Sequence, residues 1–79
     1  MNRTSELLNR ITVNPDICHG KPSIRNKRYP VEIILSHLAA GDLPKDLIIE
    51  FPDLEQDDIF ACLAYAAEVS KVKSTHLTI

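Results

Sequence analysis

Residues 31–58 read VEIILSHLAAGDLPKDLIIEFPDLEQDD, and the breaks within this stretch decide the fold. Apolar residues recur at helical spacing before Gly41, a residue typical of a helix end. Pro44 suits the first turn of a second helix, and Pro52 ends it. The acids that follow suit the start of a third helix, because carboxylates stabilise the positive end of the helix dipole. We therefore predict three helices over residues 31–72, arranged as a helix-turn-helix-like bundle.

The residues ahead of this bundle predict a short β arm. RITVN (10–14) alternates polar and apolar residues and is rich in β-branched ones, which is typical of a strand. Asn26 tolerates a positive φ, so it favours a turn within the basic segment that follows. We predict a mainly α domain with a strand and hairpin arm over 10–30. An N-terminal segment (1–9) contains a short helical turn, and a tail (73–79) follows the helices.

Size and composition favour one small globular domain. A chain of 79 residues, all assigned to a single domain (1–79), buries only about 60% of its unfolded surface. The hydrophobic content of 44% and charged content of 25% argue against disorder. No apolar run approaches the length of about 20 residues that a membrane helix needs, and the first residues lack a signal-peptide core. We expect a cytoplasmic protein.

The residues with catalytic or ligating chemistry are sparse and scattered. Two cysteines cannot form a disulfide framework, and we interpret Cys62 as a buried hydrophobe and Cys18 as a loop thiol. Gly20 and Gly41 are the only glycines, so a phosphate-binding glycine loop is excluded. We expect no enzyme activity, no cofactor and no metal site.

Charge is strongly segregated along the chain. The net charge is −2, yet residues 17–31 contain four cations and no carboxylate. We predict that these cations bind an anionic partner or nucleic acid: Lys21, Arg25, Lys27 and Arg28. The alternatives are that the arm pairs with the chain's own acids, which are concentrated over residues 42–58, or that both surfaces are merely solvated. Docking of the third helix in DNA is disfavoured, because carboxylates at its start would face phosphates.

The third helix has more apolar surface than one buried side requires. One stripe faces the core, and a second stripe, about 100° away, includes Phe60, Ala64 and Ala67. We predict that these three residues form a homodimer interface, since small alanines allow helices to approach closely. The alternative is that the N-terminal segment covers this second side.

The order and spacing of these features over residues 7–68 resemble a family of small bacterial and archaeal proteins. This family is called domain of unknown function 433 and is described as VapB-type antitoxin-like. The resemblance is carried by these residues: Gly20, Lys21, Pro22, Ile24, Arg28, Val31, Gly41, Phe51, Pro52, Ile59, Ala64 and Tyr65. The chain departs from the family pattern at Asn26-Lys27, where Gly-Thr is usual, and at Glu55, where a threonine cap is usual.

The resemblance implies a homeodomain-like, three-helix fold and a role in a toxin–antitoxin system. The chain would then bind and neutralise a PIN-like ribonuclease, with the arm or the tail (70–79) filling the nuclease site, and would regulate its own operator DNA. Two other functions fit the residues. One is a stand-alone dimeric DNA-binding transcriptional regulator, and the other is an oligomeric protein-interaction module without nucleic acid.

Overall fold

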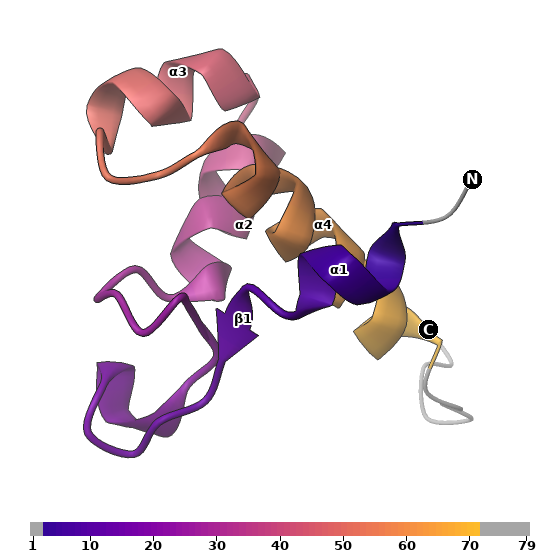
Figure 1. The fold of residues 1–79 in the computed structure, drawn as a ribbon. Coiled ribbons are helices and arrows are strands. Elements are labelled where there is room, and N and C mark those ends of the chain that lie inside the picture. The colour runs from indigo at the N-terminus through magenta and orange to yellow at the C-terminus, as the bar shows by residue number, and fades with distance from the viewer. Residues whose placement is uncertain (1–2, 72–79) are drawn as a thin grey trace, which may run out of the picture.

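Four α-helices and a short two-stranded antiparallel hairpin form the described part of the chain, so the fold is mainly helical, as predicted (Figure 1). The computed structural model describes residues 3–71. The predicted three-helix segment corresponds to α2–α4, and a fourth, five-residue helix lies where the sequence predicts a short turn. The elements in chain order are α1 (Thr4–Leu8), β1 (Ile11–Thr12), the 3₁₀ turn η1 (Cys18–Gly20), β2 (Ser23–Ile24), α2 (Val31–Ala39), α3 (Pro44–Glu50) and α4 (Gln56–Ser70).

Local signals set the boundaries of α2 and α3. α2 begins directly after Pro30 and ends shortly before Gly41, whose φ of 106° is a conformation that residues with a Cβ rarely adopt. Pro44 is the first residue of α3, where its missing N–H costs nothing. The Asp46 carboxylate accepts the backbone N–H of Leu43 at 2.9 Å and so caps this helix. The predicted breaks at Gly41 and Pro44 are confirmed.

The arm reverses twice: residues 13–22 connect β1 to β2, and a second, tighter hairpin closed by the antiparallel bridge between Ser23 and Pro30 turns where the sequence predicts it. Ile11 of β1 pairs with Ile24 of β2 in an antiparallel ladder. The chain then turns at Arg25 and Asn26, with φ values of 46° and 56°, and the Lys27 N–H donates to the Ile24 carbonyl oxygen at 2.7 Å. Asn26 is the expected turn residue. Arg25 is not, because a left-handed conformation costs such a side chain on the order of 1–2 kcal/mol.

The hydrophobic core contains residues from the arm as well as from α2, α3 and α4. Ile24 is fully buried although β2 has only two residues. The arm is therefore part of the domain rather than an appendage to a helical bundle. The buried core cluster consists of Ile24, Val31, Ile34, Leu47, Leu54, Ile59 and Cys62.

α1 packs across α4 on a side that the other helices leave open (Figure 1). Arg3, the residue before α1, donates from Nη2 to Oδ1 of Asp57 at 2.6 Å. Ala61 follows Asp57 by one helical turn and is fully buried. The N-terminal segment therefore covers one side of α4. It does not cover the whole helix, since Leu63 remains 44% exposed.

Candidate functional site

Two of the four predicted arm cations are paired with acids of their own chain. Lys21 Nζ lies 2.9 Å from Oε2 of Glu32 at the start of α2, with both side chains more than half exposed. The hydrogen bond that Lys21 donates to Glu32 raises the pKa of Lys21. Arg25 forms a much less exposed pair with Asp58 in the first turn of α4. Lys21 and Arg25 are therefore not available to bind an external anion, because each already has an anionic partner in its own chain.

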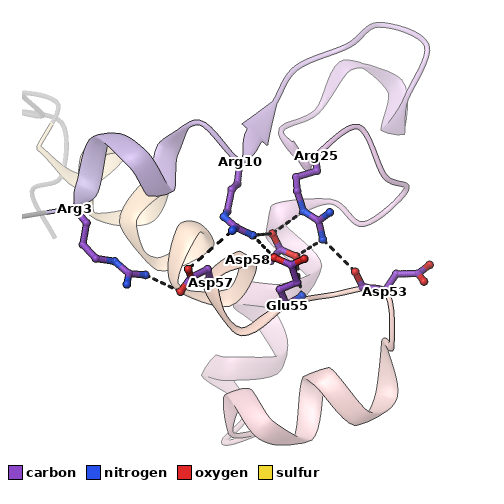
Figure 2. Close-up of polar contacts among 7 residues, drawn as sticks. All are labelled: Arg3, Arg10, Arg25, Asp53, Glu55, Asp57 and Asp58. Atoms are coloured by element: carbon purple, nitrogen blue, oxygen red, sulfur yellow. Dashed lines mark hydrogen bonds and ion pairs between the residues drawn. The ribbon is translucent and has the colours of Figure 1, made fainter.

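Asp58 is the centre of a polar cluster that joins the arm to α4 (Figure 2). Its side chain is 0% exposed, and each carboxylate oxygen accepts two hydrogen bonds. Oδ1 accepts from Nη1 of Arg10 and Nε of Arg25, both at 2.9 Å. Oδ2 accepts from Nη2 of Arg25 at 2.6 Å and from the backbone N–H of Glu55 at 2.8 Å. All the acceptor capacity of this buried carboxylate is thus used.

This cluster connects three parts of the chain at one point. Arg10 precedes β1, Arg25 follows β2, and Asp58 lies in the first turn of α4. Arg25 also donates from Nη2 to the carbonyl oxygen of Asp53 at 3.1 Å, in the segment between α3 and α4. Such bidentate, charge-assisted contacts are among the stronger hydrogen bonds in proteins. They offset the cost of the left-handed backbone at Arg25.

The cluster holds Asp58 in its charged form. Burial alone would raise the pKa of Asp58, but hydrogen bonds from Arg25, the Glu55 N–H and Arg10 together lower it below its ordinary value of 3.8. The same contacts raise the pKa of both arginines, chiefly through the hydrogen bonds that Arg10 donates to Glu55 and Arg25 donates to Asp58. At neutral pH the cluster is therefore fully ionised.

The lowered pKa predicts a particular pH dependence of stability. Because the folded-state pKa of Asp58 lies below the unfolded value, its contribution is complete above pH 3.8 and declines as pH falls further. The free energy of unfolding should therefore fall more steeply below about pH 4 in the wild type than in Asp58→Asn. Urea titrations at several pH values measure this difference. Asp57→Asn is the matched control and should retain the wild-type pH profile.

The sequence did not reveal this cluster. Asp58 was explained by the helix dipole alone, and Arg10 was assigned only to the start of a strand. The spacing of Glu55 and Asp58 was a usable signal, because it matches the two positions of a capping box at the start of α4. In that motif the carboxylate three residues after the N-cap residue accepts the backbone N–H of the N-cap residue, as Asp58 does for Glu55.

Lys27 and Arg28 are the arm cations that remain available. Within residues 3–71, no carboxylate oxygen comes within 4.0 Å of either side-chain cation. Both follow the tight turn at Arg25 and Asn26, inside the hairpin that the Ser23–Pro30 bridge closes. Arg28 is exposed, and Lys27 is half-buried. With respect to residues 3–71, the predicted four-cation surface is thus reduced to two adjacent cations without an ion pair, which we call the hairpin tip (Lys27 and Arg28).

An open pocket of about 270 Å³ lies between the arm, α2 and α4. Its walls are mostly apolar, and the Lys21–Glu32 ion pair lies among them. This shape suits an apolar side chain better than a polar substrate. The lining residues are Lys21, Pro22, Val31, Glu32, Leu35 and Tyr65.

The predicted dimer residues lie along the part of α4 that faces away from the core. Ala67 is exposed, whereas Phe60 and Ala64 are half-buried. Leu63, which the prediction omitted, is 44% exposed and lies between them. The apolar surface on this side of α4 is therefore real, and α1 covers only part of the second stripe.

The cysteines and acids form no recognisable reactive centre. Cys62 is fully buried, as predicted, and burial raises the pKa of its thiol to about 12. Over the described range 3–71, no three His, Cys, Asp or Glu residues are grouped so as to hold a metal ion. None of the helices in that range has both the length and the apolar character to cross a membrane.

Comparison with known proteins gives a family but no activity. The family model described as "Protein of unknown function (DUF433)" matches residues 11–66. A crystal structure of a DUF433 member from Anabaena variabilis is similar, with a TM-score of 0.72 and 31% identity over 81% of this chain. The chain spans 63% of the length of that protein. No curated protein matches the chain.

Proposed function

We propose that this chain, which belongs to the DUF433 family, is an antitoxin-like protein that binds and neutralises a PIN-like ribonuclease. The resemblance to VapB-type antitoxin-like proteins suggests the class of partner. The active site of such a nuclease is lined by carboxylates that bind metal ions. The hairpin tip is the part of this chain whose charge suits such a site.

The observation that carries this proposal is the pairing state of the arm. Lys21 and Arg25 are bound to Glu32 and Asp58, which leaves the two charges of the hairpin tip for a partner. An arginine fork binds a carboxylate through two parallel hydrogen bonds, and a lysine adds a compact point charge. Two adjacent cations on a hairpin match a small acidic cavity well.

The small number of unpaired cations makes DNA a less suitable partner than an acidic protein site. Each phosphate contact adds about 0.9 to the slope of log K against log salt, so two cations give a slope of only about −2 per chain. At the start of α4, Glu55 is 60% exposed and Asp57 is 43% exposed, and both would face phosphates in the usual helix-turn-helix docking. Charge therefore favours a protein partner over DNA.

The proposal includes a homeodomain-like arrangement of α2, α3 and α4. Short connections support it, because residues 40–43 join α2 to α3 and residues 51–55 join α3 to α4. In this arrangement the helix-turn-helix unit serves as a scaffold that presents the arm. The tail assigned to residues 73–79 lies outside the described residues, so the hairpin tip carries the proposal.

Reversing both charges of the hairpin tip should abolish neutralisation. Each charge-assisted hydrogen bond contributes about 1.5–3 kcal/mol, so Lys27→Glu with Arg28→Glu should weaken nuclease binding by about 100-fold or more. The measurement is co-expression with a PIN-like ribonuclease encoded by the neighbouring gene, read as growth rescue and as co-purification. Titration of the purified proteins then gives the affinity.

Lys45→Glu is the matched control, because Lys45 is an exposed cation on α3 outside the arm. It should rescue growth as the wild type does, and both variants should keep the helical circular dichroism signal. Absence of rescue and of co-purification for the wild type would overturn the proposal. Retention of operator DNA with a slope near −4, as expected for two copies, would instead support a dimeric regulator. Self-association of the chain, with no binding of either the nuclease or the operator DNA, would support the oligomeric protein-interaction module.

A further inference from the structure

We infer that the hydroxyl group of Thr12 is a positioning group for the hairpin tip. Thr12 is the last residue of β1, and its Oγ1 accepts the backbone N–H of Asn26 at 2.9 Å. Asn26 directly precedes Lys27, so this hydrogen bond fixes the turn from which the two cations extend. The inference deepens the proposed function and rests on it, because the partner that the positioned cations would meet is the proposed nuclease.

The turn that presents the hairpin tip is one that its own sequence disfavours. Arg25 and Asn26 both have a positive φ, and the Lys27 N–H donates to the Ile24 carbonyl oxygen across them. Two consecutive left-handed residues closed in this way are typical of a type I′ turn, for which Asn-Gly and Asp-Gly are the usual pairs. Arginine in the first of these positions prefers other backbone conformations. The turn therefore depends on contacts from outside it.

Neighbouring segments supply a contact to each of the two left-handed residues. The Arg25 N–H donates to the carbonyl oxygen of Arg10 at 2.8 Å, and the Arg25 side chain is bound to Asp58. The Asn26 N–H donates to Thr12 Oγ1. The contact at Asn26 is the one that a change of the acceptor side chain can remove while the Asp58 cluster stays intact. Thr12 is thus the place to test the turn separately from that cluster.

The acceptor is itself held in place by the ladder between β1 and β2. Thr12 Oγ1 lies 3.4 Å from both the carbonyl oxygen and the hydroxyl oxygen of Ser23, the residue with which Thr12 pairs. Donation of the hydroxyl proton toward Ser23 leaves a lone pair of Oγ1 for the Asn26 N–H. Ser23 is 0% exposed, and the β-branched Thr12 side chain has few rotamers. The hydroxyl group is therefore a fixed point for the turn.

The hairpin tip lies between two backbone hydrogen bonds of Ile24. The Ile24 carbonyl oxygen accepts from the Lys27 N–H at 2.7 Å, and the Ile24 N–H donates to the Tyr29 carbonyl oxygen at 3.2 Å. Lys27 and Arg28 span the distance between these two points, so their direction follows from the geometry of the turn before them. If the turn opened, the two cations would sample more orientations, and a partner would have to order them on binding.

Thr12→Val tests the role of the hydroxyl group in binding. Valine keeps the β-branched shape that suits a strand but leaves the Asn26 N–H without this acceptor. The dissociation constant for the purified nuclease should rise about fivefold, the factor that one typical hydrogen bond represents. Thr12→Ser retains the hydroxyl group and should bind as the wild type does. Urea unfolding verifies that both variants are folded under the conditions of the titration.

Backbone ¹⁵N relaxation measures the positioning itself, without the nuclease. The order parameters of Lys27 and Arg28 should be near about 0.85 in the wild type and in Thr12→Ser, and should fall toward about 0.6 in Thr12→Val. Wild-type affinity or wild-type order parameters in Thr12→Val would overturn the inference, and so would an equal loss in Thr12→Ser. If the wild type itself did not bind the nuclease, the proposed function would fail, whereas the order parameters would still decide whether Thr12 fixes the hairpin tip.

Discussion

Replacing Asp58 with asparagine is expected to lower the free energy of unfolding by about 3 kcal/mol, the lower end of the range for breaking a buried ion pair. Asparagine keeps the size of the side chain, and its carbonyl oxygen can still accept the Glu55 N–H. The change therefore removes the charge that Arg10 and Arg25 share. These arginines are 28% and 32% exposed, so they regain some water, which limits the loss.

Urea unfolding at neutral pH measures this effect, and thermal unfolding should show a decrease in Tm of about 12 °C or more for a domain of this size. Asp57→Asn is the matched control. Asp57 is the neighbouring acid, and its pair with Arg3 is 43% and 50% exposed, so it should contribute less than about 1 kcal/mol. Equal losses for the two variants would mean that Asp58 is no more important than a surface acid.

The contrast between Asp57 and Asp58 illustrates what the sequence could and could not predict. Both carboxylates suit the first turn of a helix, and the local pattern correctly placed a helix there. Which of them is buried depends on Arg10 and Arg25, which are 48 and 33 positions away in the chain. Local charge patterns carry no information on such distant partners.

The helix boundaries were predictable because their causes are local. Pro30, Gly41 and Pro44 act on the backbone of their own or adjacent residues, so no tertiary contact is needed to interpret them. The packing of another segment against α4 could not be predicted from local signals. α1 has five residues, too few for a periodic pattern, and its position on α4 follows from packing. The sequence therefore left open which of the two possible partners covers α4.

The pairing of Arg25 changes how binding experiments should be designed. A charge change at Arg25 would break the Asp58 cluster and unfold or loosen the arm, so lost binding would not identify a contact residue. The free charges at Lys27 and Arg28 can be reversed without touching that cluster. Variants of Arg25 therefore test the stability of the arm, and variants of Lys27 and Arg28 test the proposed binding.

Replacing Ile24 with alanine should cost about 3 kcal/mol, because the deletion leaves a cavity in the core. Ile24 is 0% exposed and packs among residues of α2, α3 and α4, although it belongs to a strand of two residues. If the arm were an appendage that folds only on a partner, this change would leave the helices almost unaffected. The position of Ile24 predicts the opposite, namely a loss of cooperative stability for the whole domain.

Ile49→Ala provides a control of the same chemistry at a site that is 79% exposed. It should alter the free energy of unfolding by no more than about 0.5 kcal/mol, the usual range for surface substitutions. Urea unfolding followed by circular dichroism reports on α2–α4, so it detects whether a change in the arm reaches the helices. If both substitutions had a small and equal effect, the arm would not contribute to the stability of the core. A large effect of Ile24→Ala alone would show that the arm folds together with the core, so the proposed binding of a partner by the hairpin tip would not require the arm to be ordered first.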